Sequence, residues 1–449
     1  MNSPAPRGEG GDRADRAADR ALAEAVAGLS NEVLDWRFKA VPAIADGYTV
    51  AEFLQTGPRL SDFGTPLLTL DARALSANIV AMANWCRRHG LSLAPHGKTT
   101  MAPALYLDQL RAGAWGITVA NEPQLRVARA FGVRRIHLAN SLVRPAALRW
   151  LAQQQAQDRD FRFSSWVDSV GAVEQMTAGL PAGSSVDVCV ELGVPGGRTG
   201  ARGIQVALEV AEAVRRSPRL ALVGVCGYEG AVAHGTDAEQ LATVDRYLDD
   251  LAALHTAAWP MYDLSTAGTA MLTVGGSAYF DRVATRLGGF ADPFGVRGPA
   301  TEVVLRSGAY VAHDDGYYRS ITPANRTDGP VLTSAMHGWA RVVSQPEPGL
   351  ALLDAGRRDL PFDQGLPEPQ QRIRPDGTVT PLVGAVISRL NDQHAFLELG
   401  APDDVEVGDV VRLGLSHPCT AFDKWTLIPT LEDADVRDPR VVGLIRTFF

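Results

Sequence analysis

The chain has 449 residues, of which 46% are hydrophobic and 21% charged, and its net charge is −8 at pH 7. This composition is typical of a globular protein with a large apolar core, and the acidic balance argues against nucleic acid as a partner. No apolar run approaches the roughly 20 residues of a membrane-spanning helix, and the first residues lack the apolar stretch of a signal peptide. The four cysteines, Cys86, Cys189, Cys226 and Cys419, have no paired spacing, which is typical of free thiols or a metal ligand in a reducing compartment. We therefore expect a cytoplasmic protein.

The first 60 residues are interpreted as an N-terminal extension. Residues 1–20 are mainly Ala, Arg, Asp and Gly, with no large apolar side chain after Met1, so we expect a frayed tail. Residues 32–48 carry aromatic and aliphatic side chains and should pack on the body of the protein.

From Thr65 onward, short apolar runs alternate with amphipathic stretches, which indicates βαβ units and a parallel sheet. The predicted strands are Leu67–Leu70, Leu91–Ala94, Gly116–Ala120, Arg135–Ala139, Arg162–Val167, Val186–Glu191, Leu222–Cys226 and Tyr262–Ser265. Eight such units in about 200 residues predict a (β/α)8 barrel over residues 61–298. A doubly wound sheet is the structural alternative, but no Gly-x-Gly-x-x-Gly follows the first strand.

Residues 299–449 have a different pattern, in which closely spaced strands are separated by Pro, Gly, Asp and Asn. The predicted strands here are Thr301–Leu305, Val331–His337, Leu350–Asp354, Ala385–Ser388, Ala395–Glu398 and Asp409–Leu413. Residues 359–378 contain four prolines and few core residues, so they are predicted to form a long loop. The chain therefore predicts an α/β barrel followed by a smaller all-β domain.

Lys98 lies in the segment Pro95-His-Gly-Lys-Thr99, directly after the second predicted strand. Active sites of (β/α)8 barrels lie at the carboxyl ends of the strands, and a partly desolvated lysine is a good nucleophile. Without further context, a surface lysine on a βα loop is the simpler interpretation.

This segment resembles the lysine motif of the pyridoxal-phosphate enzymes with the alanine racemase fold, in particular the D-serine dehydratase and D-threonine aldolase branch. The resemblance runs from about Thr65 to Phe449 and implies that Lys98 holds pyridoxal 5'-phosphate covalently. It also implies a homodimer, because this fold builds its site where one barrel meets a β domain. His96 is a candidate neighbour of the cofactor, and His234 and His313 are candidates for the substrate pocket.

Three further segments resemble those of the family, and a fourth is a phosphate candidate by its residue types and its position in the barrel. Arg198-Thr-Gly200 resembles the family segment whose arginine lies near the cofactor ring, and Tyr228-Glu-Gly230 resembles the one whose tyrosine faces the pyridine nitrogen. Small residues with free backbone N–H groups suit a phosphate, and the segment after the eighth predicted strand has the usual position for one. Its candidate residues are Ser265, Thr266, Gly268 and Thr269. Arg306-Ser-Gly-Ala-Tyr310 resembles the second phosphate contact, with Gly308 and Tyr310 as donors. Taken alone, the Arg198 and Ser265 segments could be plain turns, and Tyr228 could be a half-buried core tyrosine.

His417 and Cys419 are two residues apart in a segment that we expect to be extended, so both side chains would lie on one strand face. Imidazole plus thiolate is a zinc preference, although two ligands alone also fit a packed His and Cys. In the branch that the chain resembles, dehydratases carry His-x-Cys at this place and aldolases carry His-x-Asp.

The resemblance therefore implies a zinc-dependent dehydratase of D-β-hydroxy amino acids, a carbon–oxygen lyase with D-serine as the first candidate substrate. Lys98 would take the Cα proton, with zinc assisting departure of the β-hydroxyl. A metal-dependent aldolase of the D-threonine type is the main alternative. A racemase would need a second base that we do not locate, and a non-catalytic pyridoxal-phosphate binder is the alternative from another class.

Overall fold

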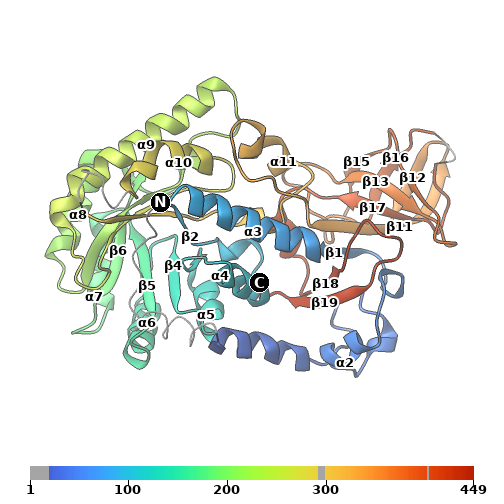
Figure 1. Ribbon diagram of the computed structural model, residues 1–449, viewed down its shortest axis with the longest axis horizontal. Helices are drawn as coiled ribbons and strands as arrows, with labels where there is room; N and C mark the ends of the chain where they lie inside the picture. Colours follow the sequence, from blue (N-terminus) through green and yellow to red (C-terminus); the bar gives the residue numbers. More distant parts are fainter. Residues whose placement is uncertain (1–19, 292–298, 402–403) are drawn as a thin grey trace. The chain divides into compact units, whose positions relative to one another are not determined.

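The computed structural model describes residues 20–291, 299–401 and 404–449 and divides the chain into two compact units (Figure 1). Among the described residues, the first unit contains residues 20–25, 83–98, 106–291 and 299–308. The second contains Val26–Met82, Thr99–Leu105 and Ala309–Phe449. The predicted tail, residues 1–20, lies almost entirely outside the described residues. No helix among the described residues has the length and apolar character needed to cross a membrane.

The sheet of the first unit is parallel and has nine strands among the described residues. Eight follow one another in the order β2-β10-β9-β8-β6-β5-β4-β3, and β7 (Ala201–Arg202) pairs only with β6. Backbone hydrogen bonds from Trp115 to Leu93 and from Thr118 to Pro95 join the segments of β2 and β3, so the sheet closes into a barrel. The eight strands are β2 (Ser92–Leu93), β3 (Ile117–Val119), β4 (Arg135–Leu138), β5 (Arg162–Val167), β6 (Val186–Gly193), β8 (Leu220–Gly227), β9 (Ala270–Thr273) and β10 (Thr301–Leu305).

Helices alternate with these strands along the chain, and several begin at a side chain that caps them. Asn121, Ser169 and Asp237 each accept a hydrogen bond from the backbone N–H three residues later, which satisfies a free donor of the first turn. The helices are α3 (Ala72–Arg88), α4 (Pro103–Arg111), α5 (Glu122–Ala130), α6 (Pro145–Gln157), α7 (Val170–Gly179), α8 (Ile204–Arg216), α9 (Ala238–Ala258) and α10 (Phe280–Leu287).

The barrel interior is filled by side chains from strands on all sides, as in a packed core rather than a pore. The cluster consists of Ala94, Trp166, Cys189, Ala221, Val223, Cys226, Met271 and Val304. Burial raises the pKa values of the Cys189 and Cys226 thiols, so both act as inert apolar side chains.

The barrel is confirmed, but two of its predicted strands are wrong. Leu67–Leu70 falls in β1 (Leu67–Asp71), which pairs with strands of the second unit. Tyr262–Ser265 is not a strand, because the Asp263 carboxylate accepts the Ser265 N–H and turns the chain. The last two barrel strands are instead β9 and β10, so the segment Thr301–Leu305 belongs to the barrel and not, as predicted, to the β domain. The barrel therefore extends beyond the predicted limit at residue 298.

The second unit contains a ten-stranded sheet among the described residues, so the separate all-β domain is also confirmed. β1 lies inside this sheet, antiparallel to β11 and parallel to β18. The remaining strands are β11 (Met336–Glu347), β12 (Leu350–Leu353), β13 (Glu368–Ile373), β14 (Val379–Pro381), β15 (Val386–Leu390), β16 (Ala395–Glu398), β17 (Val410–Gly414), β18 (Leu427–Leu431) and β19 (Val441–Arg446). The short helices of this unit are α2 (Val50–Gln55), α11 (Tyr317–Ile321) and α12 (Pro418–Phe422).

Two predictions for the second unit have different outcomes. Residues 32–48 do pack on it: Leu34 is fully buried and Glu32 pairs with Arg446 at 3.1 Å. The loop predicted for residues 359–378 is wrong in part, because it contains β13, which pairs with β17. The register shifts between Pro369 and Gln371, and this irregularity accommodates a proline that has no N–H for the ladder.

Candidate active site

Lys98 lies in a short 3-10 helix (Gly97–Thr99), which follows β2 after the residues Ala94, Pro95 and His96. The phenol of Tyr106 donates to the Gly97 carbonyl at 2.8 Å, and the Thr118 hydroxyl donates to the Ala94 carbonyl at 2.7 Å. Both donors are buried, so the turn that presents Lys98 is fixed from two sides. Helix α4 begins at Pro103, a residue suited to the first helical turn.

His96 is surrounded by positive charge in the first unit. Burial lowers its pKa well below the usual range, and the nearby Lys98 and Arg306 cations lower it further. The Arg198 cation also lowers it. The buried Nδ1 atom of His96 has no hydrogen-bond partner among the described residues. A neutral imidazole among three cations at the carboxyl ends of the strands is suited to an anionic ligand.

The structure brings together Arg198 and Tyr228, two of the predicted site residues. The Arg198 guanidinium carbon lies 4.9 Å from the centre of the Tyr228 ring. The loop that carries Arg198 is held by Arg202, whose guanidinium donates to the carbonyls of residues 197–200 at 2.8–3.1 Å. The Tyr228 backbone N–H donates to the Tyr247 phenol, which donates to the Leu192 carbonyl. Backbone and buried side chains therefore place this pair at the ends of β6 and β8.

Glu229, next to Tyr228, holds a glycine loop that the sequence alone did not single out. Its carboxylate accepts the N–H of Gly275 at 3.0 Å and of Gly276 at 2.6 Å, directly after β9. Gly276 packs against Tyr228, because a Cβ there would lie 2.9 Å from the phenol ring. Burial raises the pKa of Glu229, although the bonds from the glycine amides oppose it. Gly-Gly-Ser after an apolar run is the signal that could have identified this loop.

Arg306 is the second residue whose importance emerges only from the structure. It is 4% exposed and lies at the end of β10, 4.9 Å above the Trp166 ring. It donates to the Thr273 hydroxyl at 2.7 Å and to the Gly227 carbonyl. One buried cation thus ties together the carboxyl ends of β8, β9 and β10.

The predicted phosphate segment lies at the wrong end of the barrel. Ser265, Thr266, Gly268 and Thr269 precede β9 instead of following a strand. The Thr266 hydroxyl donates to the Asp187 carboxylate, near the start of β6, beside a cavity of about 110 Å³. The Gly275 and Gly276 loop follows β9 at the end of the barrel where a phosphate is expected, but both of its amides donate to Glu229. Gly308 and Tyr310 follow β10 in the chain, and their role as donors stays a prediction.

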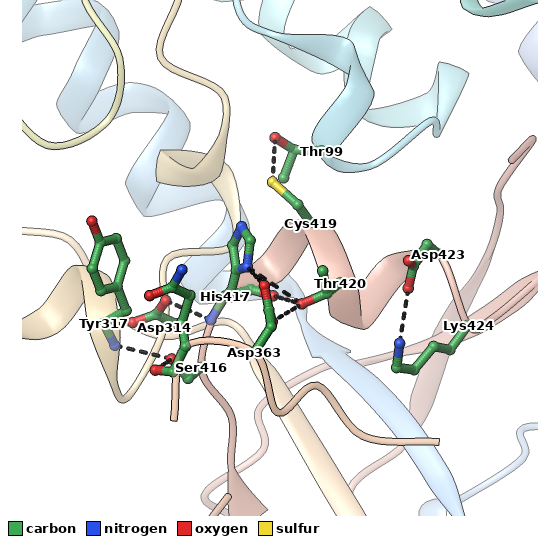
Figure 2. Close-up of polar contacts among 11 residues, drawn as sticks. Thr99, Asp314, Tyr317, Asp363, Ser416, His417, Cys419, Thr420, Asp423 and Lys424 are labelled. Carbon is green, nitrogen blue, oxygen red and sulfur yellow. Dashed lines mark hydrogen bonds and ion pairs between the residues drawn. The ribbon is translucent and has the colours of Figure 1, made fainter. Parts of the chain in front are cut away.

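His417 and Cys419 are brought together, although not on a strand. His417 has a left-handed backbone (φ 55°) and precedes α12, and Cys419 lies in the first turn of that helix. Burial lowers the pKa of His417, but hydrogen bonds with Cys419 and Asp363 outweigh this and raise it to about 9. Figure 2 shows Asp363 at one edge of the imidazole and Cys419 towards the other. Among the described residues no group of three or more His, Cys, Asp or Glu side chains could hold a metal ion.

Comparisons with known proteins agree with both units. The family model of the alanine racemase N-terminal domain matches residues 70–289, and that of a putative serine dehydratase domain matches residues 335–431. A D-threonine aldolase from Arthrobacter sp. is 30% identical over 394 residues, 86% of this chain and 93% of the relative. A D-threo-3-hydroxyaspartate dehydratase from Delftia sp. (strain HT23) is 31% identical over 137 residues, 30% of this chain and 35% of the relative.

A solved structure has the same fold over nearly its whole length. The D-threonine aldolase from Filomicrobium marinum matches with a TM-score of 0.72 at 25% identity, covering 87% of this chain and 97% of that one. Since the Arthrobacter relative is matched across barrel and β domain alike, the likeness is not confined to the cofactor-binding barrel. The chain belongs to the D-serine dehydratase and D-threonine aldolase branch of the alanine racemase-like, fold type III pyridoxal-phosphate enzymes.

Proposed function

We propose that the protein is a pyridoxal-phosphate- and zinc-dependent dehydratase of D-β-hydroxy amino acids, with D-serine as its first candidate substrate. The net products from D-serine would be pyruvate and ammonia, since the water lost on elimination returns when the released enamine is hydrolysed. The observation that carries this proposal is the placement of His417 and Cys419 together at the start of α12, with Asp363 at one edge of the imidazole and Cys419 towards the other.

The barrel end fits pyridoxal phosphate. Lys98, Arg198 and Arg306 supply positive charge around the unpaired His96 nitrogen. Lys98 would hold the cofactor covalently, and Gly308 and Tyr310 would face its phosphate. When bound, the cofactor draws electrons from the substrate α-carbon and so makes the Cα proton acidic.

Lys98 is the group that would remove this proton. Hydrogen bonds from Tyr106 and Thr118 fix the turn that carries Lys98, so the Lys98 amine would have a defined position when it is not bonded to the cofactor. An amine held within hydrogen-bond reach of Cα–H is a competent general base. Arg198 and Tyr228, stacked at the ends of their strands, would orient the cofactor ring on which the substrate is held.

His417 and Cys419 fit a zinc ion, because imidazole and thiolate are its usual ligands. Two protein ligands would leave positions on the ion for water and for the substrate hydroxyl. When bound, zinc supplies a Lewis acid that stabilises the charge on the departing oxygen. The thiol in place of a carboxylate favours the dehydratase over the aldolase, following the His-x-Cys and His-x-Asp distinction within the branch.

A metal-dependent D-threonine aldolase-type enzyme is the second candidate. Its support is the relative from Arthrobacter sp., which is similar over 394 residues, whereas the dehydratase from Delftia sp. is similar over 137. Such an enzyme would take a proton from the β-hydroxyl and cleave the Cα–Cβ bond, giving glycine and an aldehyde. The product therefore separates the two candidates.

The test is to incubate the enzyme with D-serine, D-threonine and D-threo-3-hydroxyaspartate, with and without a chelator, and to measure keto acid and glycine. The proposal expects keto acid as the main product and its loss on metal removal, with recovery on adding zinc. Glycine as the main product would replace the proposal by the aldolase. Keto acid that persists without metal would overturn the zinc requirement.

We also propose a homodimer, which rests on the family resemblance alone. Light scattering coupled to size-exclusion chromatography would measure it, and a monomeric mass for the active enzyme would contradict it.

A further inference from the structure

We propose that Asp363 and Thr99 are positioning residues for the metal pair, Asp363 through the His417 imidazole and Thr99 through the Cys419 sulfur. This inference rests on the proposed metal-dependent function. By its contact with one imidazole nitrogen, Asp363 would leave only the other nitrogen of His417 to bind the ion. Thr99 would fix the direction of the sulfur lone pairs (Figure 2).

Both oxygens of Asp363 are engaged beside α12. Oδ2 lies 2.6 Å from His417 Nδ1, and Oδ1 accepts the Thr420 hydroxyl at 2.6 Å. A carboxylate at this distance requires the proton on Nδ1, which leaves the Nε2 lone pair for a metal. The second bond fixes the plane of the carboxylate, so the imidazole is oriented as well as protonated on a chosen atom.

The segments that carry Asp363 and His417 are tied together next to this contact. The Ser416 hydroxyl donates to the carbonyl of Gln364 at 2.8 Å, joining the two segments through the neighbours of both residues. The backbone N–H of His417 donates to Asp314 Oδ2 at 2.9 Å. Asp314 is 1% exposed, and its other oxygen accepts backbone N–H groups at the start of α11. The unusual backbone of His417 is therefore held by surrounding structure, as expected for a functional residue with φ above zero.

Thr99 acts on the other member of the pair. Its hydroxyl lies 3.3 Å from Cys419 Sγ, within hydrogen-bond reach of a sulfur atom, and its side chain is buried. A hydroxyl donor stabilises a thiolate and fixes its rotamer. Thr99 is also the residue after Lys98 in the chain, so the group that aims the sulfur is one peptide bond from the cofactor lysine.

The experiment measures zinc affinity of the cofactor-loaded enzyme by competition with a chromophoric chelator. Asp363→Asn should bind zinc about 10- to 100-fold more weakly, the usual effect of removing the hydrogen-bond partner of a metal-bound histidine. Asp423→Asn is the matched control: Asp423 ends the same helix and pairs with the neighbouring Lys424 at 3.3 Å, so zinc affinity should not change. Thr99→Val should weaken binding, and Thr99→Ser, which keeps the hydroxyl, should restore it.

Cobalt(II) in place of zinc separates positioning from folding. Asp363→Asn should shift the ligand-field bands while the thiolate-to-cobalt band is kept, and Thr99→Val should shift the thiolate band. If Asp363→Asn fails to fold, Thr420→Val removes one of the two bonds to Asp363 and should give a smaller shift of the same kind.

His417→Ala and Cys419→Ala distinguish the inference from the function beneath it. If these variants bind zinc as the wild type does, the metal site itself is refuted. If they lose zinc while the Asp363 and Thr99 variants keep wild-type affinity and cobalt spectra, the positioning inference alone is overturned.

Discussion

Gly97→Ala tests how rigidly the turn before Lys98 is held. A Cβ at Gly97 would lie 2.8 Å from the ring carbon and oxygen of the Tyr106 phenol and 3.0 Å from Ile117 Cγ2. Tyr106 and Ile117 are both fully buried, and the Tyr106 hydroxyl is bound to the Gly97 carbonyl itself, so neither neighbour can simply swing away. Overpacking of this kind costs about 1–3 kcal/mol. We expect a loss of unfolding free energy in that range.

The same strain should reach Lys98, the next residue. Moving the turn by a fraction of an ångström displaces the amine, so the variant should retain less pyridoxal phosphate after gel filtration, measured by cofactor absorbance. Gly171→Ala is the control, because a Cβ there meets nothing within 4 Å, and alanine in a helix is favoured over glycine by up to about 1 kcal/mol. A Gly97→Ala protein with wild-type stability and full cofactor content would refute the view that this turn is rigid.

Three further predictions concern other parts of the molecule. Glu229→Gln replaces one acceptor oxygen by a donor facing the glycine amides, so denaturant titration should show a loss of about 1–3 kcal/mol, with exposed Glu239→Gln as a neutral control. Burial lowers the pKa of His255 from 6.5 to about 4, so the unfolded chain binds the extra proton first. Unfolding free energy should fall as pH drops from about 6.5 to about 4, by up to about 3 kcal/mol for this group, and a flat profile would contradict it. Cys419→Asp exchanges a soft sulfur for hard oxygens, so activity should shift from zinc towards Mn²⁺ in metal-substitution assays, and unchanged zinc preference would argue against Cys419 as a ligand.

The sequence predicted the barrel because its strands are apolar on both faces and alternate with amphipathic helices. The same apolar character led to the assignment of β1 to the barrel. Its five residues are all buried in the other sheet, and periodicity cannot distinguish such a strand from a barrel strand. The error displaces the strand count by one, and Tyr262–Ser265 then counts as the last strand. Because of this shift, the predicted phosphate segment was expected after a strand. It lies before β9 instead, at the opposite end of that strand.

The residues of the sequence motifs were easier to predict than the residues that hold them in position. Lys98, Arg198 and Tyr228 follow strands, and their place at the carboxyl ends follows from barrel geometry. Asp363 contacts His417 from 54 positions away in a segment predicted to be a featureless loop. Thr99 contacts Cys419 across 320 positions, a pairing that no local spacing could indicate. Short-range pattern thus identifies the reacting groups, whereas the residues that aim them depend on tertiary contacts.

The position of β1 inside the second sheet also imposes an order on synthesis and folding. Leu67 pairs with Trp339 and Leu70 with Thr430. This early strand therefore cannot pair with its neighbours until residues near the end of the chain have been synthesised. Until then both of its edges lack their native partners, while the barrel strands from Ser92 to Leu305 are already complete. Contacts of such long sequence separation slow folding and expose an apolar strand to intermolecular pairing. A truncated chain that stops after the barrel would leave β1 in that state permanently, and removing residues up to Asp71 along with the β domain should give a more soluble barrel.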